Sequence, residues 1–175
     1  MDFNKSDFIT KKKSANMKNK VVIIMGSKAD LEQAEKIAST LKRFKTETIL
    51  RIASAHKVPL KCYNLIKEYE KENVVFVTIA GMSNALSGFT DAQTHCPVIA
   101  CPPYSDKFGG ADLFSSIRMP SGVAPLMVLS PENAALAAAK IIGLSNPEVQ
   151  EQVIAFQNNK REELEAADNE LQKHR

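Results

Sequence analysis

Four consecutive residues, Ser54-Ala55-His56-Lys57, place a hydroxyl, an imidazole and an ammonium group in one short segment. A histidine titrates near neutral pH and can accept or return a proton, and a neighbouring lysine can hold an anion. The segment follows the β-rich stretch 47–53 and is closed by Pro59, so we expect it at the carboxyl end of a strand. Ligands of open α/β sheets bind at such strand ends.

A second polar segment, Gly26-Ser27-Lys28-Ala29-Asp30, separates a strand pattern from a helix pattern. Such a turn offers free amides and a hydroxyl to a phosphate group, and the helix dipole adds attraction. It has neither the P-loop pattern nor the dinucleotide-binding glycine pattern. Taken alone it is typical of a capped turn, in which Asp30 either caps the helix or accepts a sugar hydroxyl. Together with the His56 segment it favours phosphate binding.

Strand patterns alternate with helix patterns along most of the chain. The run 21–25 is wholly apolar and mostly β-branched, which indicates a strand buried on both faces. The predicted strands are 21–25, 48–53, 74–80, 97–101 and 126–129, and the predicted helices are 31–44, 59–72, 83–94, 110–118 and 131–143. This alternation predicts an α/β fold, a three-layer αβα sandwich around a doubly wound, parallel, five-stranded sheet of the flavodoxin-like kind.

The loops that follow the predicted strands carry most of the residues suited to chemistry. They are rich in Gly, Ser, Asn and His and cover residues 26–30, 54–59, 81–88, 101–110 and 119–122. Because the carboxyl ends of parallel strands meet at one edge of the sheet, we expect these loops to form a single site.

Composition and charge exclude several classes of protein. With 175 residues, 44% of them hydrophobic and 25% charged, the chain is long enough for one domain with a sizeable core. No apolar run approaches the roughly 20 residues that cross a bilayer. Residues 1–20 hold six Lys and two Asp, a net charge of +4, so the remainder of the +3 chain carries −1. A nearly neutral body gives no electrostatic footprint for nucleic acid.

The two ends of the chain differ from this body. Residues 1–19 are polar and basic, a pattern that predicts a flexible extension. The alternating pattern of residues 20–145 predicts the α/β catalytic domain. From 146 to 175 the pattern predicts a long polar helix with a thin apolar stripe. Its apolar positions are Val149, Val153, Phe156, Leu164 and Leu171. We expect this helix to pack on a neighbouring subunit rather than in a core, with a solvated tail as the competing interpretation of the last ten residues.

Cysteine usage favours a reducing compartment. Cys62, Cys96 and Cys101 are odd in number and lack metal-ligand spacing, so we expect free thiols and a cytoplasmic location. Cys101 is expected to pack near the site without acting as a nucleophile.

Six motifs that occur in order resemble the aminoimidazole ribonucleotide (AIR) carboxylase family of purine biosynthesis, the PurE type. They are Gly26-Ser-Lys-Ala-Asp30, Ser54-Ala-His-Lys57, Ala80-Gly-Met-Ser-Asn-Ala-Leu86, Cys101-Pro-Pro103, Ser115-Ser-Ile-Arg-Met-Pro-Ser-Gly122 and Leu129-Ser-Pro-Glu132. The resemblance covers about residues 20–160. Lys57 in the second motif, the Ser83-Asn84 pair and Ser130-Pro-Glu132 resemble the class II branch, which adds carbon dioxide directly to AIR.

The resemblance implies a reaction and a set of roles. AIR and carbon dioxide would be the substrates, 4-carboxy-AIR (CAIR) the product, and no metal or cofactor would be needed. His56 would be catalytic, removing the proton of carbon 4. Ser27, Ser54 and Lys57 would bind phosphate, Asp30 the ribose hydroxyls, and the backbone of 81–84 the carboxylate. The implied substrate-binding set is Gly26, Ser27, Asp30, Ser54, Ala55, Lys57, Gly81, Met82, Ser83 and Asn84. The resemblance also implies a homo-octamer.

The chain departs from the family pattern at two positions. Ala29 stands where the family usually has Ser, and Met82 stands where the carbon dioxide-using branch usually has Arg. Two other functions stay open beside the carboxylase. One is the mutase of the sister branch, which isomerises N5-carboxy-AIR, and the other is a catalytically lapsed paralogue that only binds a nucleotide. An unrelated flavodoxin-like binder would fit the fold but not the six motifs.

Overall fold

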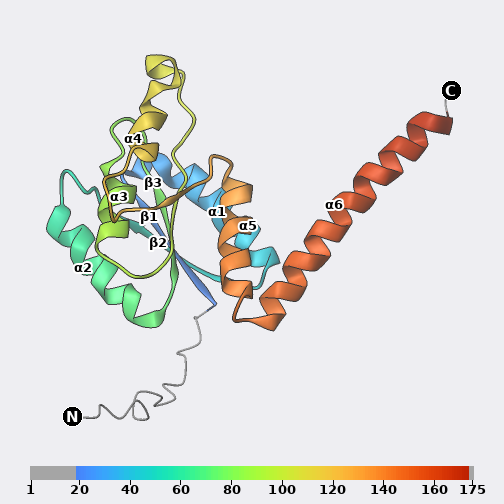
Figure 1. Cartoon of the computed structure of the whole chain (residues 1–175), viewed down its shortest axis with the longest axis horizontal. Helices are drawn as coiled ribbons and strands as arrows, with labels where there is room; N and C mark the ends of the chain where they lie inside the picture. Colours follow the sequence, from blue (N-terminus) through green and yellow to red (C-terminus); the bar gives the residue numbers. More distant parts are fainter. Residues whose placement is uncertain (1–18, 174–175) are drawn as a thin grey trace, which may run out of the picture.

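The computed structural model describes residues 19–173 and contains a five-stranded parallel sheet (Figure 1). Its strands are β1 (Lys20–Met25), β2 (Glu47–Ile52), β3 (Val75–Ile79), β4 (Val98–Ala100) and β5 (Leu126–Met127). They lie in the order β2-β1-β3-β4-β5, and all four neighbouring pairs are parallel. This is the doubly wound order of the flavodoxin-like fold, so the predicted fold class is confirmed. The predicted extension, residues 1–19, lies outside the described residues except for Asn19.

Helices cover both faces of the sheet. They are α1 (Leu31–Arg43), α2 (Pro59–Tyr69), α3 (Ala85–Ala92), α4 (Phe114–Ile117), α5 (Pro131–Gly143) and α6 (Pro147–Lys173), with 3₁₀ turns η1 (Lys28–Asp30), η2 (Glu70–Glu72) and η3 (Lys107–Leu113). Val21 and Ile23 of β1 belong to a core with α1 and α5, whereas Val22 and Ile24 belong to a second core with α2. Because successive strand residues point to opposite faces, β1 is buried on both sides, and the three layers follow.

The carboxyl ends of β1 and β3 mark the point where the chain changes direction across the sheet. From β1 the chain crosses to β2 on one side, and from β2 it returns past β1 to β3 on the other. Ligands of doubly wound sheets bind in the crevice at such a switch point. The topology therefore places the site beside the loops that follow β1, β2 and β3.

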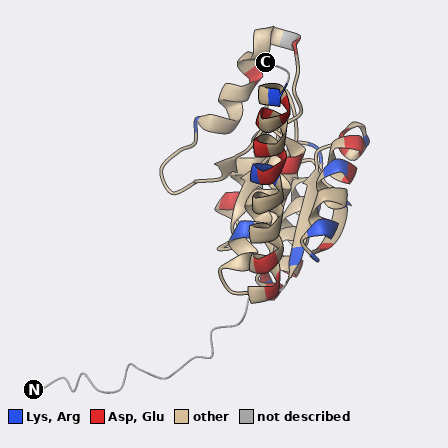
Figure 2. Cartoon of the chain, turned by 90° about the vertical axis from the view of Figure 1, so that its right-hand side faces the viewer, with Lys and Arg blue, Asp and Glu red and all other residues tan. Residues whose placement is uncertain are grey.

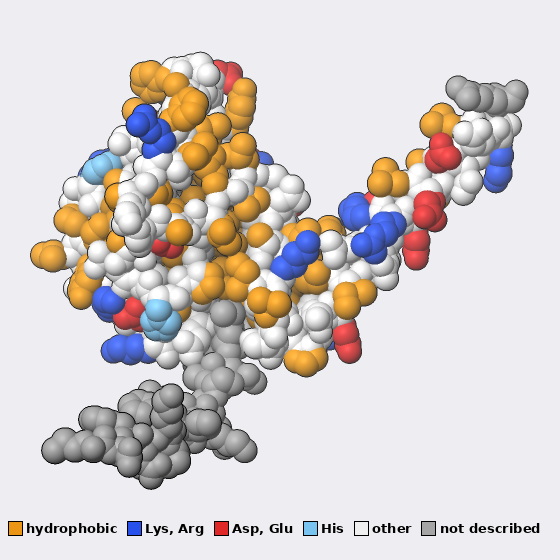
Figure 3. Space-filling model, in the orientation of Figure 1, with side chains coloured by type: hydrophobic (Ala, Val, Ile, Leu, Met, Phe, Trp, Pro, Cys, Tyr) orange, Lys and Arg blue, Asp and Glu red, His pale blue; other side chains and the backbone are white. Residues whose placement is uncertain are grey.

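Helix α6 begins in the core and then leaves the body of the protein (Figures 1 and 3). Val149 and Val153 are buried in the core of α1 and α5, and the Phe156 ring meets Phe44 edge-on, with centroids 5.5 Å apart. The expectation that this helix packs on a neighbouring subunit rather than in a core is therefore wrong for its first part, which packs in the core of its own chain. Further along, Leu164 and Leu171 are 73% and 69% exposed.

Charge and hydropathy of the described body agree with the sequence pattern. Basic and acidic residues are interspersed along the helices in the view of Figure 2. Among the helices of residues 19–173, none combines the length and apolar character that a bilayer crossing requires.

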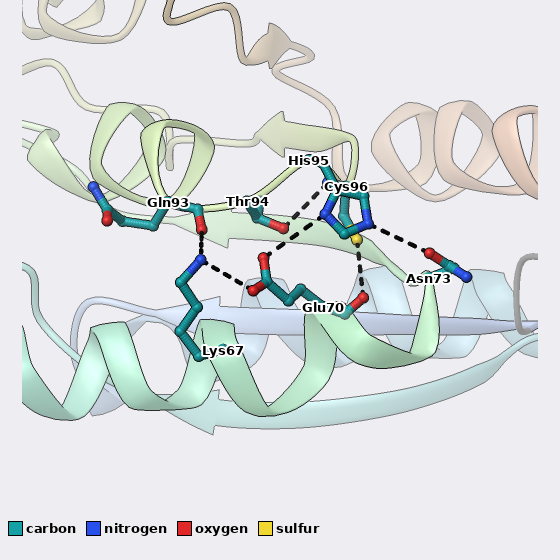
Figure 4. A network of polar contacts seen from close by, with 7 residues as sticks. All are labelled: Lys67, Glu70, Asn73, Gln93, Thr94, His95 and Cys96. Atoms are coloured by element: carbon teal, nitrogen blue, oxygen red, sulfur yellow. Dashed lines mark hydrogen bonds and ion pairs between the residues drawn. The ribbon is translucent and has the colours of Figure 1, made fainter.

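A polar network ties α2 to the segment before β4, at the edge of the sheet opposite the strand-end loops (Figure 4). Lys67 Nζ donates to Glu70 Oε1 at 3.0 Å and also to the Gln93 carbonyl, while His95 Nδ1 lies 4.0 Å from Glu70 Oε2. Burial alone would raise the pKa of Glu70, but hydrogen bonds from Lys67 and Thr94 outweigh it and hold the pKa below its ordinary value. Glu70 is thus favoured as a carboxylate in the folded protein.

Replacing Glu70 with glutamine is expected to remove a stabilisation that depends on pH. A carboxylate with a depressed folded-state pKa stabilises the protein above its unfolded pKa of about 4.3, and this contribution disappears as the pH falls through the folded-state value. We expect Glu70→Gln to lower the free energy of unfolding by about 1 kcal/mol at neutral pH. Urea titrations of both proteins between pH 3 and 7 measure the difference. A difference that did not shrink at the acidic end would contradict this account.

Candidate active site

The strand-end loops surround one open cleft with a volume of about 610 Å³. Its walls come from the loops that follow β1, β2, β3 and β4. The lining residues are Gly26, Ser27, Ala29, Asp30, Ser54, Ala55, His56, Lys57, Ala80, Gly81, Met82, Ser83, Ala85, Leu86, Pro103 and Ser105. Three polar segments, 26–30, 54–57 and 81–83, are each separated from the next by 24 positions in the sequence and meet in one place, as the alignment of parallel strand ends requires.

The first wall is a capped turn between β1 and α1. Ser27 N donates to Asp30 Oδ2 at 2.9 Å, the Ser27 hydroxyl donates to the same oxygen at 3.2 Å, and Ala29 N donates to Ser27 Oγ at 3.2 Å. This reciprocal bonding fixes the turn at the start of the helical segment. Gly26 permits the turn to approach β3, because a Cβ there would lie 3.2 Å from the Ala80 Cβ. Asp30 thus acts as a cap in this structure and lines the cleft as well.

The second wall carries His56 and Lys57, whose side chains are exposed at the cleft. The segment is held from below, since Ala53 is buried and its N–H donates to the Met25 carbonyl at 2.9 Å. Ser54 Oγ accepts the N–H of Lys57 at 3.2 Å, which curls the segment into a turn. Pro59 then occupies the first turn of α2, where its missing N–H costs nothing. The backbone of this segment is therefore fixed, and His56 and Lys57 line the cleft.

The third wall is the turn Gly81–Asn84 between β3 and α3. Met82 has a φ of 58°, in the left-handed region, and its side chain is 63% exposed. Gly81 faces Pro103 so closely that a Cβ there would lie 3.2 Å from the proline ring. Asn84 is only 3% exposed, does not line the cleft and caps α3 by accepting the Ser87 N–H at 3.3 Å. Because Asn84 is the N-cap, α3 begins at Ala85 rather than at residue 83, where the predicted helix began.

The predicted site residues are brought together with one exception. All of them line the cleft apart from Asn84, which lies beneath it. Six further residues line the cleft that the predicted site set did not include: Ala29, Ala80, Ala85, Leu86, Pro103 and Ser105. Pro103 and Ser105 lie in the predicted loop 101–110 after the fourth strand. Their position after this strand could have identified them as site residues.

Cys101 lies at the end of β4, below the cleft, and is fully buried. Burial raises the pKa of its thiol to about 11, although a contact from Gln33 acts in the opposite direction. Burial likewise raises the pKa of Cys62 to about 11. A thiol with such a pKa is almost entirely protonated at neutral pH and is a poor nucleophile. Cys101 therefore has a packing role, as the sequence predicted.

The AIR carboxylase family profile matches residues 20–163. The chain belongs to this family. A phosphoribosylaminoimidazole carboxylase of Archaeoglobus fulgidus is 66% identical over 152 residues, which cover 87% of this chain and 84% of that protein. One of Treponema denticola is 46% identical over 159 residues, 90% of this chain and all of that protein. The crystal structure of Treponema denticola PurE matches with a TM-score of 0.85 and 47% identity, over 87% of this chain and 98% of that one.

These findings confirm the family and the enzyme class that the six motifs predicted, and the fold that the alternation of strand and helix patterns predicted. The chain is a member of a carboxylase family of purine biosynthesis.

Proposed function

We propose that the cleft binds AIR and adds carbon dioxide to carbon 4 of its imidazole ring, with His56 as the proton-transfer residue. The observation that carries this proposal is the meeting of His56 and Lys57 with the capped Gly26–Asp30 turn in one cleft. A cleft of about 610 Å³ suits a phosphorylated ribose that carries an imidazole ring, as AIR does. One wall of the cleft is a turn of the kind that binds phosphate, and the next wall carries a histidine as the base.

The reaction needs positioning more than activation. The amine of AIR raises the electron density at carbon 4, which attacks carbon dioxide to form a carbon–carbon bond. The proton on carbon 4 must then leave, and it goes to the His56 imidazole, which later releases it to solvent. In the reverse direction the same group returns the proton as carbon dioxide departs. Holding both reactants in one orientation supplies much of the acceleration in such a reaction.

The three walls divide the substrate between them. We assign the phosphate to Ser27, Ser54 and Lys57, which combine hydroxyls with an ammonium group on adjacent loops. Asp30 keeps its cap through Oδ2 and accepts ribose hydroxyls through Oδ1. The backbone amides of Gly81, Met82 and Ser83 face the developing carboxylate, where fixed N–H dipoles stabilise negative charge. The Asn84 N–H is held by the Ser115 hydroxyl instead.

Product formation from AIR and bicarbonate without ATP tests this proposal. We expect CAIR to accumulate with the wild-type protein, and we expect no added metal or biotin to be required. Turnover of N5-carboxy-AIR that ignored carbon dioxide would favour the mutase instead. Binding of AIR without any turnover would favour a lapsed paralogue. The names of the Archaeoglobus and Treponema relatives, both carboxylases, support the direct reaction.

The three free, buried thiols suit the reducing cytoplasm, where we place the reaction.

We further propose a homo-octamer in which α6 packs on a neighbouring subunit. A groove of about 530 Å³ lies between α1, α5 and the first half of α6. It combines the apolar Leu136 and Phe156 with three basic residues and one acidic residue, Arg43, Lys160, Arg161 and Glu132. The part of α6 beyond this groove carries five acidic residues between positions 162 and 170, together with the exposed Leu164 and Leu171. An acidic helix with apolar positions complements a basic groove with an apolar floor.

Placing aspartate at both Leu164 and Leu171 is expected to shift the assembly toward smaller species, because charge would enter the apolar contact. Light scattering coupled to size exclusion measures the mass of each protein, and the wild type should elute as eight chains. Changing Leu60 to aspartate, at an exposed leucine on α2 away from α6 and the groove, provides the control. An unchanged mass for the double variant would contradict the role given to α6.

A further inference from the structure

The hydroxyl of Ser115, on α4, contacts two backbone groups of the turn that forms the third wall of the cleft, the Met82 carbonyl and the Asn84 N–H. Ser115 Oγ lies 3.0 Å from the Met82 carbonyl oxygen and accepts the Asn84 N–H at 3.0 Å. It also lies 2.7 Å from the carbonyl oxygen of Asp112, three residues before it. A hydroxyl has one proton, so it donates to Met82 or to Asp112 at any moment while accepting from Asn84.

The turn that Ser115 bridges requires support from its surroundings. Met82 has a φ of 58°, a backbone conformation that residues other than glycine rarely adopt. Such a conformation persists only where the neighbouring structure fixes it. Ser115 bonds to the carbonyl of this strained residue and to the N–H of the residue two positions further on. Beneath it, Asn84 Nδ2 donates to the Ser116 hydroxyl at 2.8 Å, and both side chains are at least 97% buried. Two consecutive serines therefore anchor one turn.

Other contacts hold the same lobe of the protein, residues 102–119, near the turn without Ser115. Pro103 packs against Gly81, and Met119 packs against Gly88. The second contact is so close that a Cβ on Gly88 would lie 2.9 Å from the Met119 sulfur. In Figure 3 hydrophobic side chains gather over this lobe at the top of the view. The lobe would remain in place if the Ser115 hydroxyl were removed, so the hydroxyl's own contribution can be measured.

We propose that Ser115 is a positioning residue for carboxylation, in that its hydroxyl holds the Met82–Asn84 backbone in the shape that presents amides to carbon dioxide and to the new carboxylate. The inference rests on the proposed function, because it assigns those amides to the one-carbon substrate. Ser115 itself does not line the main cleft. It acts on the reaction through the backbone between Met82 and Asn84.

Replacing Ser115 with alanine is expected to raise KM for carbon dioxide by about tenfold, the size of effect that accompanies loss of one hydrogen bond. KM for AIR should stay within about twofold of the wild type, because its phosphate and ribose contacts lie on the other two walls. Ser115→Thr keeps the hydroxyl and should restore KM for carbon dioxide. Ser39 also bonds the carbonyl three residues before it, at 2.9 Å, but lies on α1 outside the cleft, so Ser39→Ala is the matched control.

Steady-state kinetics in both substrates tests the inference. A merely structural loss would reduce the active fraction and lower kcat while leaving both KM values unchanged, and that result would overturn it. Wild-type values for Ser115→Ala would also overturn it. Failure of the proposed function is distinguishable, since the wild type would then give no product. Hydrogen exchange at the Asn84 amide needs no turnover and should accelerate in Ser115→Ala; equal exchange rates in the two proteins would contradict the hydroxyl's role.

Discussion

Replacing His56 with asparagine is expected to lower kcat for carboxylation by about 10²–10⁴-fold, the usual contribution of a positioned acid or base. Asparagine has a similar polar shape but cannot take up the proton that leaves carbon 4. KM for AIR should change little, because the phosphate and ribose contacts are assigned to other residues. The initial rate of CAIR formation at saturating AIR measures the effect.

His95 provides the matched control for this substitution. It lies in the network with Glu70 and Asn73, outside the cleft, so His95→Asn changes the same functional group at a distance from the reaction. We expect its kcat to equal that of the wild type. A His56→Asn protein that kept kcat within tenfold of the wild type would show that another group moves the proton.

Removing the Asp30 carboxylate is expected to raise KM for AIR by roughly 10- to 150-fold, the range for loss of hydrogen bonds to a charged group. The Asp30→Ala change removes the acceptor for ribose hydroxyls and also the cap that fixes the Ser27 hydroxyl beside the phosphate. Both effects act on substrate binding, so kcat should fall less than kcat/KM. Titration of the initial rate against AIR separates the two parameters.

Loss of a helix cap alone must be separated from loss of the substrate contact. Asn146 caps α6 by accepting the N–H groups of Glu148 and Val149 at 3.1 and 3.3 Å, and it lies outside the cleft. The Asn146→Ala protein should lose about 1 kcal/mol of stability and keep its KM. If Asp30→Ala behaved in the same way, Asp30 would be a cap and nothing more.

Local sequence patterns predicted most of the sheet, because the pattern reports burial directly. The run 21–25 is apolar throughout since β1 lies at the middle of three packed layers. The carboxyl ends of the strands meet by topology alone, so the meeting of His56 with Ser27 and Gly81 followed from the strand order.

Features that depend on tertiary contacts were harder to predict. The predicted helix 110–118 is a 3₁₀ segment followed by a short α4, with Phe108, Gly109 and Gly110 all at positive φ. The two glycines permit this conformation, but nothing local requires it at Phe108. Likewise, the burial of Asn84 depends on Ser116, which is 32 residues further along the chain.

The origin of the carboxyl carbon tests the central claim most directly. The protein is supplied with AIR, unlabelled N5-carboxy-AIR and ¹³C-bicarbonate together, and the early product is examined by ¹³C NMR. A carboxylase that adds free carbon dioxide to AIR at the His56 cleft should place the label in CAIR, and His56→Asn should not. CAIR formed rapidly from N5-carboxy-AIR without label would contradict the account and show transfer within one substrate.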